Sequence, residues 1–238
     1  MKSHQPQPPF KPPAAIIFDC DGTLVDSERI SLAVLAELVN RHGASLTAEE
    51  ATRRFSGQDL KVVFQEIGNE LGNPLPSDII EQFRAIQLPR LRQSTPPIDG
   101  ADALLESLDM PFCVASNAPL EKIGVCLDAS GLRRHFYDDR IFSAYEVGRW
   151  KPDPALFLHA ATQMNAEPQN CWVVEDSRFG VDAAVAAGMS TFVFDPHNKF
   201  PTSDRWHRIG KLRELSRYLS RSVAEAANQT DPTPETMG

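Results

Sequence analysis

Residues 16–24 decide the fold, and they read IIFDCDGTL. The apolar part is typical of a fully buried strand, the kind that parallel sheets use. It stops at Asp19, and a second carboxylate, Asp21, follows two residues later. Because open parallel sheets bind ligands beyond the carboxyl ends of their strands, both side chains are expected at a functional edge. Gly22 favours a tight turn there and lets a ligand approach the backbone closely.

The spacing of these two carboxylates suits phosphoryl transfer. An ionised Asp19 can attack a phosphorus atom and carry the phosphoryl group as a covalent intermediate. Asp21 could protonate the leaving oxygen and then take a proton from the incoming water. A Mg²⁺ ion, which prefers carboxylate and phosphate oxygens, would relieve the repulsion between two carboxylates and a phosphate. For this stretch alone, the alternative is a helix cap at Asp19 and an ordinary turn residue at Asp21.

The composition of the 238 residues is that of an ordinary globular protein, with 42% hydrophobic residues and a formal net charge of −8. The negative charge argues against nonspecific binding to nucleic acid or anionic membranes, since both need a positive surface. No apolar run approaches the ~20 residues of a membrane-spanning helix, and residues 1–13 lack the apolar segment of a secretory signal. Four widely spaced cysteines are typical of reduced thiols. We therefore expect a cytoplasmic protein.

Helical patterns without a strand signal fill the chain from the first predicted strand to about residue 91. Such a block is far longer than the dozen or so residues of an ordinary crossover connection. We expect an all-helical cap at residues 29–92, inserted into an α/β core made of residues 14–28 and 93–219. The alternative is that these helices cover one face of the sheet. The proline-rich residues 1–13 and the polar residues 220–238 are predicted to be disordered tails.

Three further apolar strands are each followed by residues that can bind a phosphate or a metal. They are 112–115 with Ser116 and Asn117, 140–143 with the loop that carries Lys151, and 171–174 with Glu175 and Asp176. Each feature has an ordinary interpretation by itself, such as a helix cap or a solvated lysine. A parallel sheet, however, aligns the carboxyl ends of its strands at one edge. The pattern therefore predicts that a nucleophile, an acid/base, phosphate donors and metal ligands converge, as phosphoryl transfer requires.

The four motifs resemble those of the haloacid dehalogenase (HAD) superfamily, subfamily I, in the branch that holds β-phosphoglucomutase and sugar-phosphate phosphatases. The resemblance spans roughly residues 14–219. The motifs occur in order as DxDGTLxDS at residues 19–27, Ser116-Asn117, Lys151-Pro152 and Glu175-Asp176-Ser177. The resemblance implies a Rossmann-like, doubly wound parallel sheet with an inserted helical cap that closes over small substrates.

The resemblance also implies a role for each motif residue. Asp19 would be the nucleophile and a Mg²⁺ ligand, while Asp21 would be the acid and base, with its backbone carbonyl on the metal. Asp176 would bind Mg²⁺ directly, and Glu175 would bind the ion or orient its waters. The transferring phosphoryl group would be held by Ser116, Asn117 and Lys151.

The implied activity is a Mg²⁺-dependent phosphohydrolase of small phosphorylated metabolites, with sugar or sugar-acid phosphates preferred, acting through an aspartyl-phosphate intermediate. A phosphosugar mutase of the β-phosphoglucomutase type is the alternative, because the two activities share the whole core. Asp21 argues against haloacid dehalogenases and phosphonate hydrolases, which resemble this plan but lack that carboxylate. The expected partner is a small phosphorylated substrate, and the expected state is a monomer or a weak dimer.

Cap residues would decide between phosphatase and mutase, since a mutase must protect its aspartyl phosphate from water. The cap segment expected to face the site is Ser56-Gly57. The basic candidates near it are Arg53, Arg54 and Lys61, for which a solvated helix face is the alternative.

Overall fold

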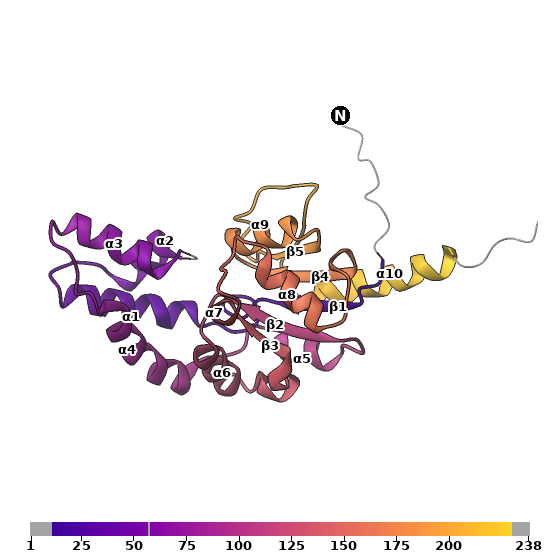
Figure 1. Cartoon of the computed structure of the whole chain (residues 1–238), viewed down its shortest axis with the longest axis horizontal. Coiled ribbons are helices and arrows are strands. Elements are labelled where there is room, and N and C mark those ends of the chain that lie inside the picture. The colour runs from indigo at the N-terminus through magenta and orange to yellow at the C-terminus, as the bar shows by residue number, and fades with distance from the viewer. Residues whose placement is uncertain (1–10, 57, 230–238) are drawn as a thin grey trace, which may run out of the picture.

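The computed structural model describes residues 11–56 and 58–229, with side chains up to residue 224. The residues form an α/β lobe and a smaller helical lobe (Figure 1). Of the predicted tails at 1–13 and 220–238, residues 1–10 and 230–238 lie outside the described residues. No helix in the described part of the chain is both long and apolar enough to cross a membrane.

The α/β lobe contains a six-stranded, all-parallel sheet with strand order β3-β2-β1-β4-β5-β6. The strands are β1 (Ala15–Phe18), β2 (Phe112–Ser116), β3 (Ile141–Ser143), β4 (Cys171–Glu175), β5 (Ser190–Phe194) and β6 (His207–Ile209). The register aligns Phe18 with Val114 on one side and with Val174 on the other. The carboxyl ends of β1, β2 and β4 therefore meet at one edge, and the predicted α/β fold class is confirmed.

Both faces of the sheet are covered by helices, which explains why the central strands β1, β2 and β4 are mostly apolar. Ile16 and Phe18 face one hydrophobic cluster, whereas Ala15 and Ile17 face the other, as the twofold periodicity of a strand requires. The helices of this lobe are α5 (Ala101–Glu106), α6 (Leu120–Ala129), α7 (Ala144–Val147), α8 (Ala155–Gln163), α9 (Arg178–Ala186) and α10 (Leu215–Gln229). The clusters place α5, α6 and α10 on one face and α8 and α9 on the other.

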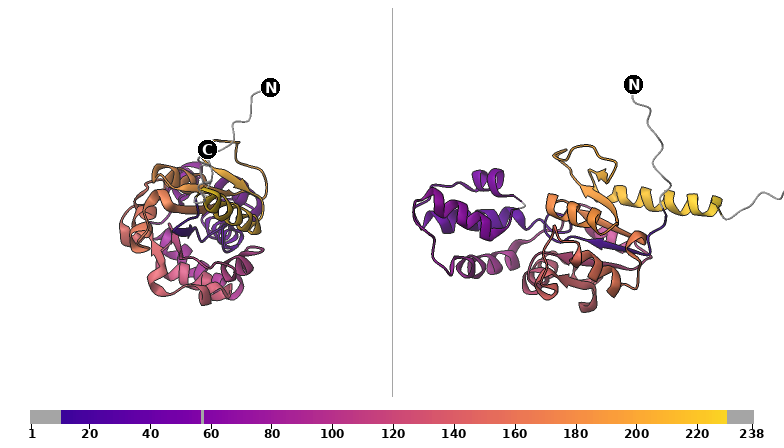
Figure 2. Two further views of the ribbon diagram at one scale, coloured as in Figure 1. Left: turned by 90° about the vertical axis from the view of Figure 1, so that its right-hand side faces the viewer. Right: turned by 45° about the horizontal axis from the view of Figure 1, so that its top comes forward.

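Four helices form the second lobe, which stands apart from the sheet in Figure 1 and in the right panel of Figure 2. They are α1 (Glu28–Asn40), α2 (Ala48–Phe55), α3 (Leu60–Glu70) and α4 (Ile79–Ser94). These helices enclose a hydrophobic cluster of their own, which includes Leu35, Phe55, Phe64 and Phe83. Thr47 begins α2 with a capping box, because its hydroxyl accepts from the Glu50 amide at 3.1 Å and the Glu50 carboxylate accepts from its amide at 2.9 Å.

Helix α4 belongs to both lobes. Phe83 packs in the cluster of the helical lobe, whereas Leu88 and Leu91 pack against the cluster on the sheet. Pro89 lies inside the helix between Leu88 and Leu91, in the part that packs beside the sheet, where it removes one backbone hydrogen bond. The boundary that the sequence places at residue 92 therefore falls within a continuous helix.

The predicted disordered tail from residue 220 is wrong for residues 220–229, because α10 continues to Gln229. This part of the chain reads SRSVAEAANQ and contains several strong helix formers. Ser222 is buried, and its hydroxyl donates to the Leu219 carbonyl oxygen at 2.8 Å. Strand β6 was not predicted either, since its three residues, His207 to Ile209, include two polar ones.

Candidate active site

A buried lysine joins the ends of two strands. The Nζ atom of Lys151 donates to Asp19 Oδ1 at 2.5 Å and to Glu175 Oε1 at 2.8 Å. Asp19 directly follows β1, and Glu175 is the last residue of β4. All three side chains are at least nine-tenths buried. The structure thus brings together three of the predicted site residues from distant parts of the chain.

Asp176 lies against the turn that follows β1. Its Oδ1 atom accepts a hydrogen bond from the Thr23 hydroxyl at 3.0 Å. Gly22 has a φ of +85°, and a Cβ atom built on it would be 2.1 Å from Asp176 Oδ2. Gly22 is therefore needed for the close approach of a neighbouring carboxylate as well as for the turn.

Glu175 is held on both carboxylate oxygens. Oε1 accepts from Lys151, while Oε2 accepts from the Ser177 amide at 2.7 Å and from the Ser177 hydroxyl at 2.9 Å. The carboxylate also lies over Gly180 of α9, where a Cβ atom would be 1.8 Å from Oε1. The absence of a side chain at Gly180 thus provides the space in which Glu175 meets Lys151.

The variant Gly180→Ala is expected to lose stability and at least tenfold in kcat/KM. In an open helix position the same change would gain up to about 1 kcal/mol, but here the new methyl group must displace Glu175 from Lys151. Thermal unfolding and phosphate release measure the two effects. Gly124→Ala in α6 is the matched control, because nothing lies within 4 Å of a Cβ atom there. A Gly180→Ala protein as stable and active as wild type would contradict this reading of Glu175.

Asp21 lies on the same turn, but it forms its ion pair with a different lysine from the one that binds Asp19. Its Oδ2 atom accepts from Lys122 Nζ at 2.8 Å, and its Oδ1 atom accepts from the Ser27 hydroxyl. Ser27 precedes α1 without a capping hydrogen bond to that helix. Its hydroxyl therefore serves Asp21 rather than the helix N-terminus.

The residues after β2 hold the lysine loop. Asn117 Oδ1 accepts from the Lys151 amide at 2.9 Å, and its Nδ2 donates to the Lys151 carbonyl oxygen at 3.4 Å. Ser116 is buried at the end of β2, and its hydroxyl accepts from the Ala118 amide at 3.1 Å. Asn117 thus binds the backbone of Lys151, a contact that the sequence does not reveal.

The site carries an excess of negative charge. Burial raises the pKa of Asp19 to about 7, because lost hydration and the Glu175 and Asp21 carboxylates outweigh the attraction of Lys151. Burial, with Glu175 and Asp19, also raises the pKa of Asp176 well above its usual value. Burial opposes ionisation of Asp21 too, but Lys122 and Ser27 lower its pKa. Four carboxylates thus face two ammonium groups, and the surplus lies on the side of Asp19 and Asp176.

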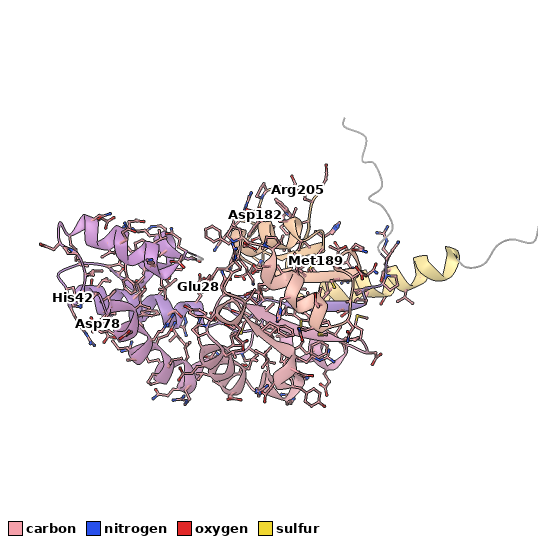
Figure 3. All side chains as sticks on the ribbon, in the orientation of Figure 1. Glu28, His42, Asp78, Asp182, Met189 and Arg205 are labelled. Atoms are coloured by element: carbon pink, nitrogen blue, oxygen red, sulfur yellow. The ribbon has the colours of Figure 1, made fainter. Side chains whose placement is uncertain are left out.

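Glu28, the first residue of α1, lies where the helical lobe meets the α/β lobe (Figure 3). Its Oε1 accepts from the Ser56 hydroxyl at 2.7 Å. Arg54 forms ion pairs with Glu70 and with Glu66, the latter at 3.1 Å. Arg54 is thus tied to α3 inside its own lobe. The other two basic candidates, Arg53 and Lys61, are exposed on α2 and α3.

The sequence assigns no role in the site to Thr23, Ser27 or Lys122. Thr23 and Ser27 are part of the DxDGTLxDS motif, so their proximity to the site could be anticipated, although their partners could not. Lys122 gives no local signal, because a lysine in the first turn of a helix is usually solvated. Only the packing of α6 against the turn at Asp21 reveals it.

Comparison with known proteins agrees with this geometry. The family described as haloacid dehalogenase-like hydrolase matches residues 16–194. The chain is 40% identical over 207 residues to 6-phosphogluconate phosphatase of Escherichia coli, covering 84% of this chain and 93% of the relative. It is 28% identical over 181 residues to a phosphorylated carbohydrates phosphatase of Thermotoga maritima, covering 74% and 82%.

A solved structure supports the same assignment. A HAD family hydrolase from Deinococcus radiodurans, with bound phosphate and sodium, superposes with a TM-score of 0.71 at 27% identity. The match covers 94% of this chain and all of the other chain. The family match extends over most of the sequence and includes all four motifs. The chain therefore belongs to the haloacid dehalogenase-like hydrolases.

Proposed function

We propose that this protein is a Mg²⁺-dependent phosphatase of small phosphorylated sugars or sugar acids that works through an aspartyl phosphate on Asp19. The observation that carries the proposal is the contact of Lys151 with Asp19 and Glu175 at the sheet edge where Asp176 also lies. A nucleophile beside a fixed cation is what phosphoryl transfer requires of a protein. The two phosphatase relatives support the substrate class.

The donor set suits Mg²⁺ rather than a metal held by protein atoms alone. Among the described residues, no three His, Cys, Asp or Glu side chains are grouped closely enough to form a complete site. Mg²⁺ typically uses one or two carboxylates and fills its shell with waters and substrate phosphate oxygens. We assign Asp19, Asp176 and the backbone carbonyl of Asp21 as its protein ligands. Glu175, whose oxygens are occupied by Lys151 and Ser177, acts mainly by holding Lys151.

The charge of the buried carboxylates supports a divalent cation at this site. Asp19 and Asp176 both have raised pKa values, so they are destabilised as anions where they lie. A divalent cation between them would balance the two negative charges that Lys151 and Lys122 leave over. When bound, Mg²⁺ neutralises charge on the phosphate and aligns it with the nucleophile.

The residues of the chain then perform two half-reactions. Asp19 attacks phosphorus, a bond forms from its carboxylate oxygen, and the ester bond to the leaving oxygen breaks. Asp21, which its lowered pKa leaves ionised, first takes a proton from solvent and then gives it to the leaving oxygen. In the second half, Asp21 takes a proton from water, the water oxygen bonds to phosphorus, and the bond to Asp19 breaks. Lys151, with the Ser116 hydroxyl and the Asn117 loop, stabilises the charge on the phosphoryl oxygens.

The function is tested by phosphate release from a panel of phosphorylated metabolites that includes 6-phosphogluconate, hexose phosphates and hexitol phosphates. We expect free phosphate and the dephosphorylated compound, with the sugar-acid or sugar phosphates giving the highest kcat/KM. Product analysis by NMR separates this outcome from the mutase alternative. An isomerised sugar phosphate without release of phosphate would overturn the proposal.

Removal of Mg²⁺ is expected to stop turnover, and added Mg²⁺ is expected to restore it.

Mg²⁺ should also raise the Tm of the protein, and the increase should be larger at pH 8 than at pH 5.5. The pKa of Asp19 is raised from 3.8 to about 7 on folding, so the metal-free protein loses stability as pH rises through that range. Binding of Mg²⁺ to the ionised carboxylate offsets this loss, whereas at pH 5.5 it must first displace a proton. Metal-independent turnover, or equal Tm shifts at both pH values, would contradict the assignment.

A further inference from the structure

Lys122 reaches the site from a helix that carries none of the four motifs. It lies in the first turn of α6 and donates from Nζ to Asp21 Oδ2 at 2.8 Å, although the two residues are 101 positions apart. The side chains are mostly buried, with exposed fractions of 18% for Lys122 and 26% for Asp21. Exposed pairs of this kind contribute little, but a partly buried pair at this distance fixes the position of both groups.

The carboxylate of Asp21 is held at both oxygens by donors from different parts of the fold. Lys122 binds Oδ2 from the α/β lobe, and the Ser27 hydroxyl binds Oδ1 from the residue that precedes α1. Two donors on two oxygens define the plane of the carboxylate as well as its location. The turn that carries Asp21 is itself closed by a hydrogen bond from the Gly22 amide to the Val25 carbonyl oxygen at 2.8 Å.

The two lysines divide the carboxylates between them. Lys151 pairs with Asp19 and Glu175, whereas Lys122 pairs with Asp21, and within the described part of the chain Lys122 has no second ion-pair partner. Asp21 is near enough to Lys151 to feel its charge. Without Lys122, the Ser27 hydroxyl alone would hold the Asp21 carboxylate, and the carboxylate could turn toward Lys151.

We propose that Lys122 is a positioning residue that holds Asp21 in the orientation required for its two proton transfers. The proposal rests on the proposed function, since it assumes that Asp21 exchanges protons with the leaving oxygen and with water. Lys122 itself forms no bond to the substrate and exchanges no proton. A 1 Å displacement of an acid/base group can cost about 10²-fold in rate, so the orientation set by Lys122 matters to kcat more than to substrate binding.

The test uses Lys122→Met and Lys122→Arg in the full-length protein with Mg²⁺, and two substrates. 6-Phosphogluconate has a poor leaving group, whereas p-nitrophenyl phosphate has a good one that departs without an acid. For Lys122→Met on 6-phosphogluconate we expect kcat to fall by about 10- to 100-fold with KM within about threefold, since acid/base catalysis contributes about 10²–10⁴-fold. Lys122→Arg should recover part of the loss. Lys211→Met, which removes an exposed lysine of the same lobe, is the control and should stay within twofold of wild type.

Rapid-quench kinetics with p-nitrophenyl phosphate separates positioning from folding. In Lys122→Met we expect a burst of nitrophenolate close to one per protein molecule, because Asp19 is still phosphorylated, followed by slow turnover as water attack fails. A merely structural role would lower the burst amplitude and leave the turnover per active site unchanged. That result, or a kcat within twofold of wild type on 6-phosphogluconate, would overturn the role of Lys122.

Asp21→Asn distinguishes failure of this inference from failure of the proposed function. If Asp21→Asn is impaired and Lys122→Met is not, the role of Lys122 is wrong and the phosphatase stands. If wild type releases no phosphate, or Asp21→Asn turns over normally, the underlying assignment of Asp21 is wrong and the role of Lys122 is overturned with it.

Discussion

Asp19→Asn is expected to lower kcat for phosphate-ester hydrolysis by about 10⁴-fold or more, as loss of a covalent nucleophile does in other hydrolases. The amide has nearly the shape of the carboxylate but lacks its nucleophilic charge. The residue directly follows β1, and its oxygen already lies 2.5 Å from the Lys151 ammonium that would stabilise the phosphoryl group. Phosphate release gives the rate, and mass spectrometry of acid-quenched protein shows whether a phosphoenzyme forms.

The fold of the Asp19→Asn protein is expected to remain intact. A neutral amide removes repulsion from Glu175 and Asp21, which together with burial raise the pKa of Asp19, while Lys151 retains Glu175 as a partner. Circular dichroism and Tm serve as the control. A well-folded variant that releases phosphate within tenfold of the wild-type rate would show that another group is the nucleophile.

Lys151→Met is expected to reduce both stability and activity strongly. The variant leaves Asp19 and Glu175 buried without their shared cation. Removal of one partner from a buried ion pair typically costs about 3–5 kcal/mol, and loss of a transition-state cation typically lowers kcat by at least about 10²-fold. Urea denaturation measures the first effect, and phosphate release measures the second.

The stability deficit of Lys151→Met is expected to depend on pH. Lys151 lowers the pKa of Asp19, so its removal moves a pKa that burial already raises still further from 3.8. A group with a raised pKa in the folded state favours folding below its unfolded pKa and loses that contribution as pH rises. The deficit relative to wild type should therefore be larger at pH 8 than at pH 5.5. Lys211→Met, with an exposed side chain, provides the control, and a deficit that grows toward acid pH would contradict the ion-pair explanation.

The sequence was most informative where its signals were local and repeated. Apolar strands that end at polar residues predict the parallel sheet, and the helical patterns up to about residue 91 predict the helical lobe. Strand β6 was missed because three residues, two of them polar, carry no periodic pattern. The sequence does not separate the extension of α10 to Gln229 from a disordered tail, because this segment is polar although it contains strong helix formers.

The site shows the same division between local and long-range information. The meeting of Asp19, Lys151 and Glu175 follows from the parallel sheet, since the ends of β1 and β4 share an edge. The contact of Lys122 with Asp21 depends instead on how far α6 lies from the turn after β1. Such a distance is set by tertiary packing, and no spacing in the sequence encodes it.

Helix α4 limits how the two lobes can be exchanged between relatives by protein engineering. Its first turns are part of the interior of the helical lobe, while Leu88 and Leu91 near its end complete the interior beside the sheet. A chimera joined at the end of the helix would import foreign side chains into the recipient's interior and leave a void or a clash there. The permissive splice point lies between Ile86 and Leu88, because Ile86 is the last residue of α4 that packs in the helical lobe and Leu88 is the first that packs beside the sheet. A junction there lets each interior keep its native residues.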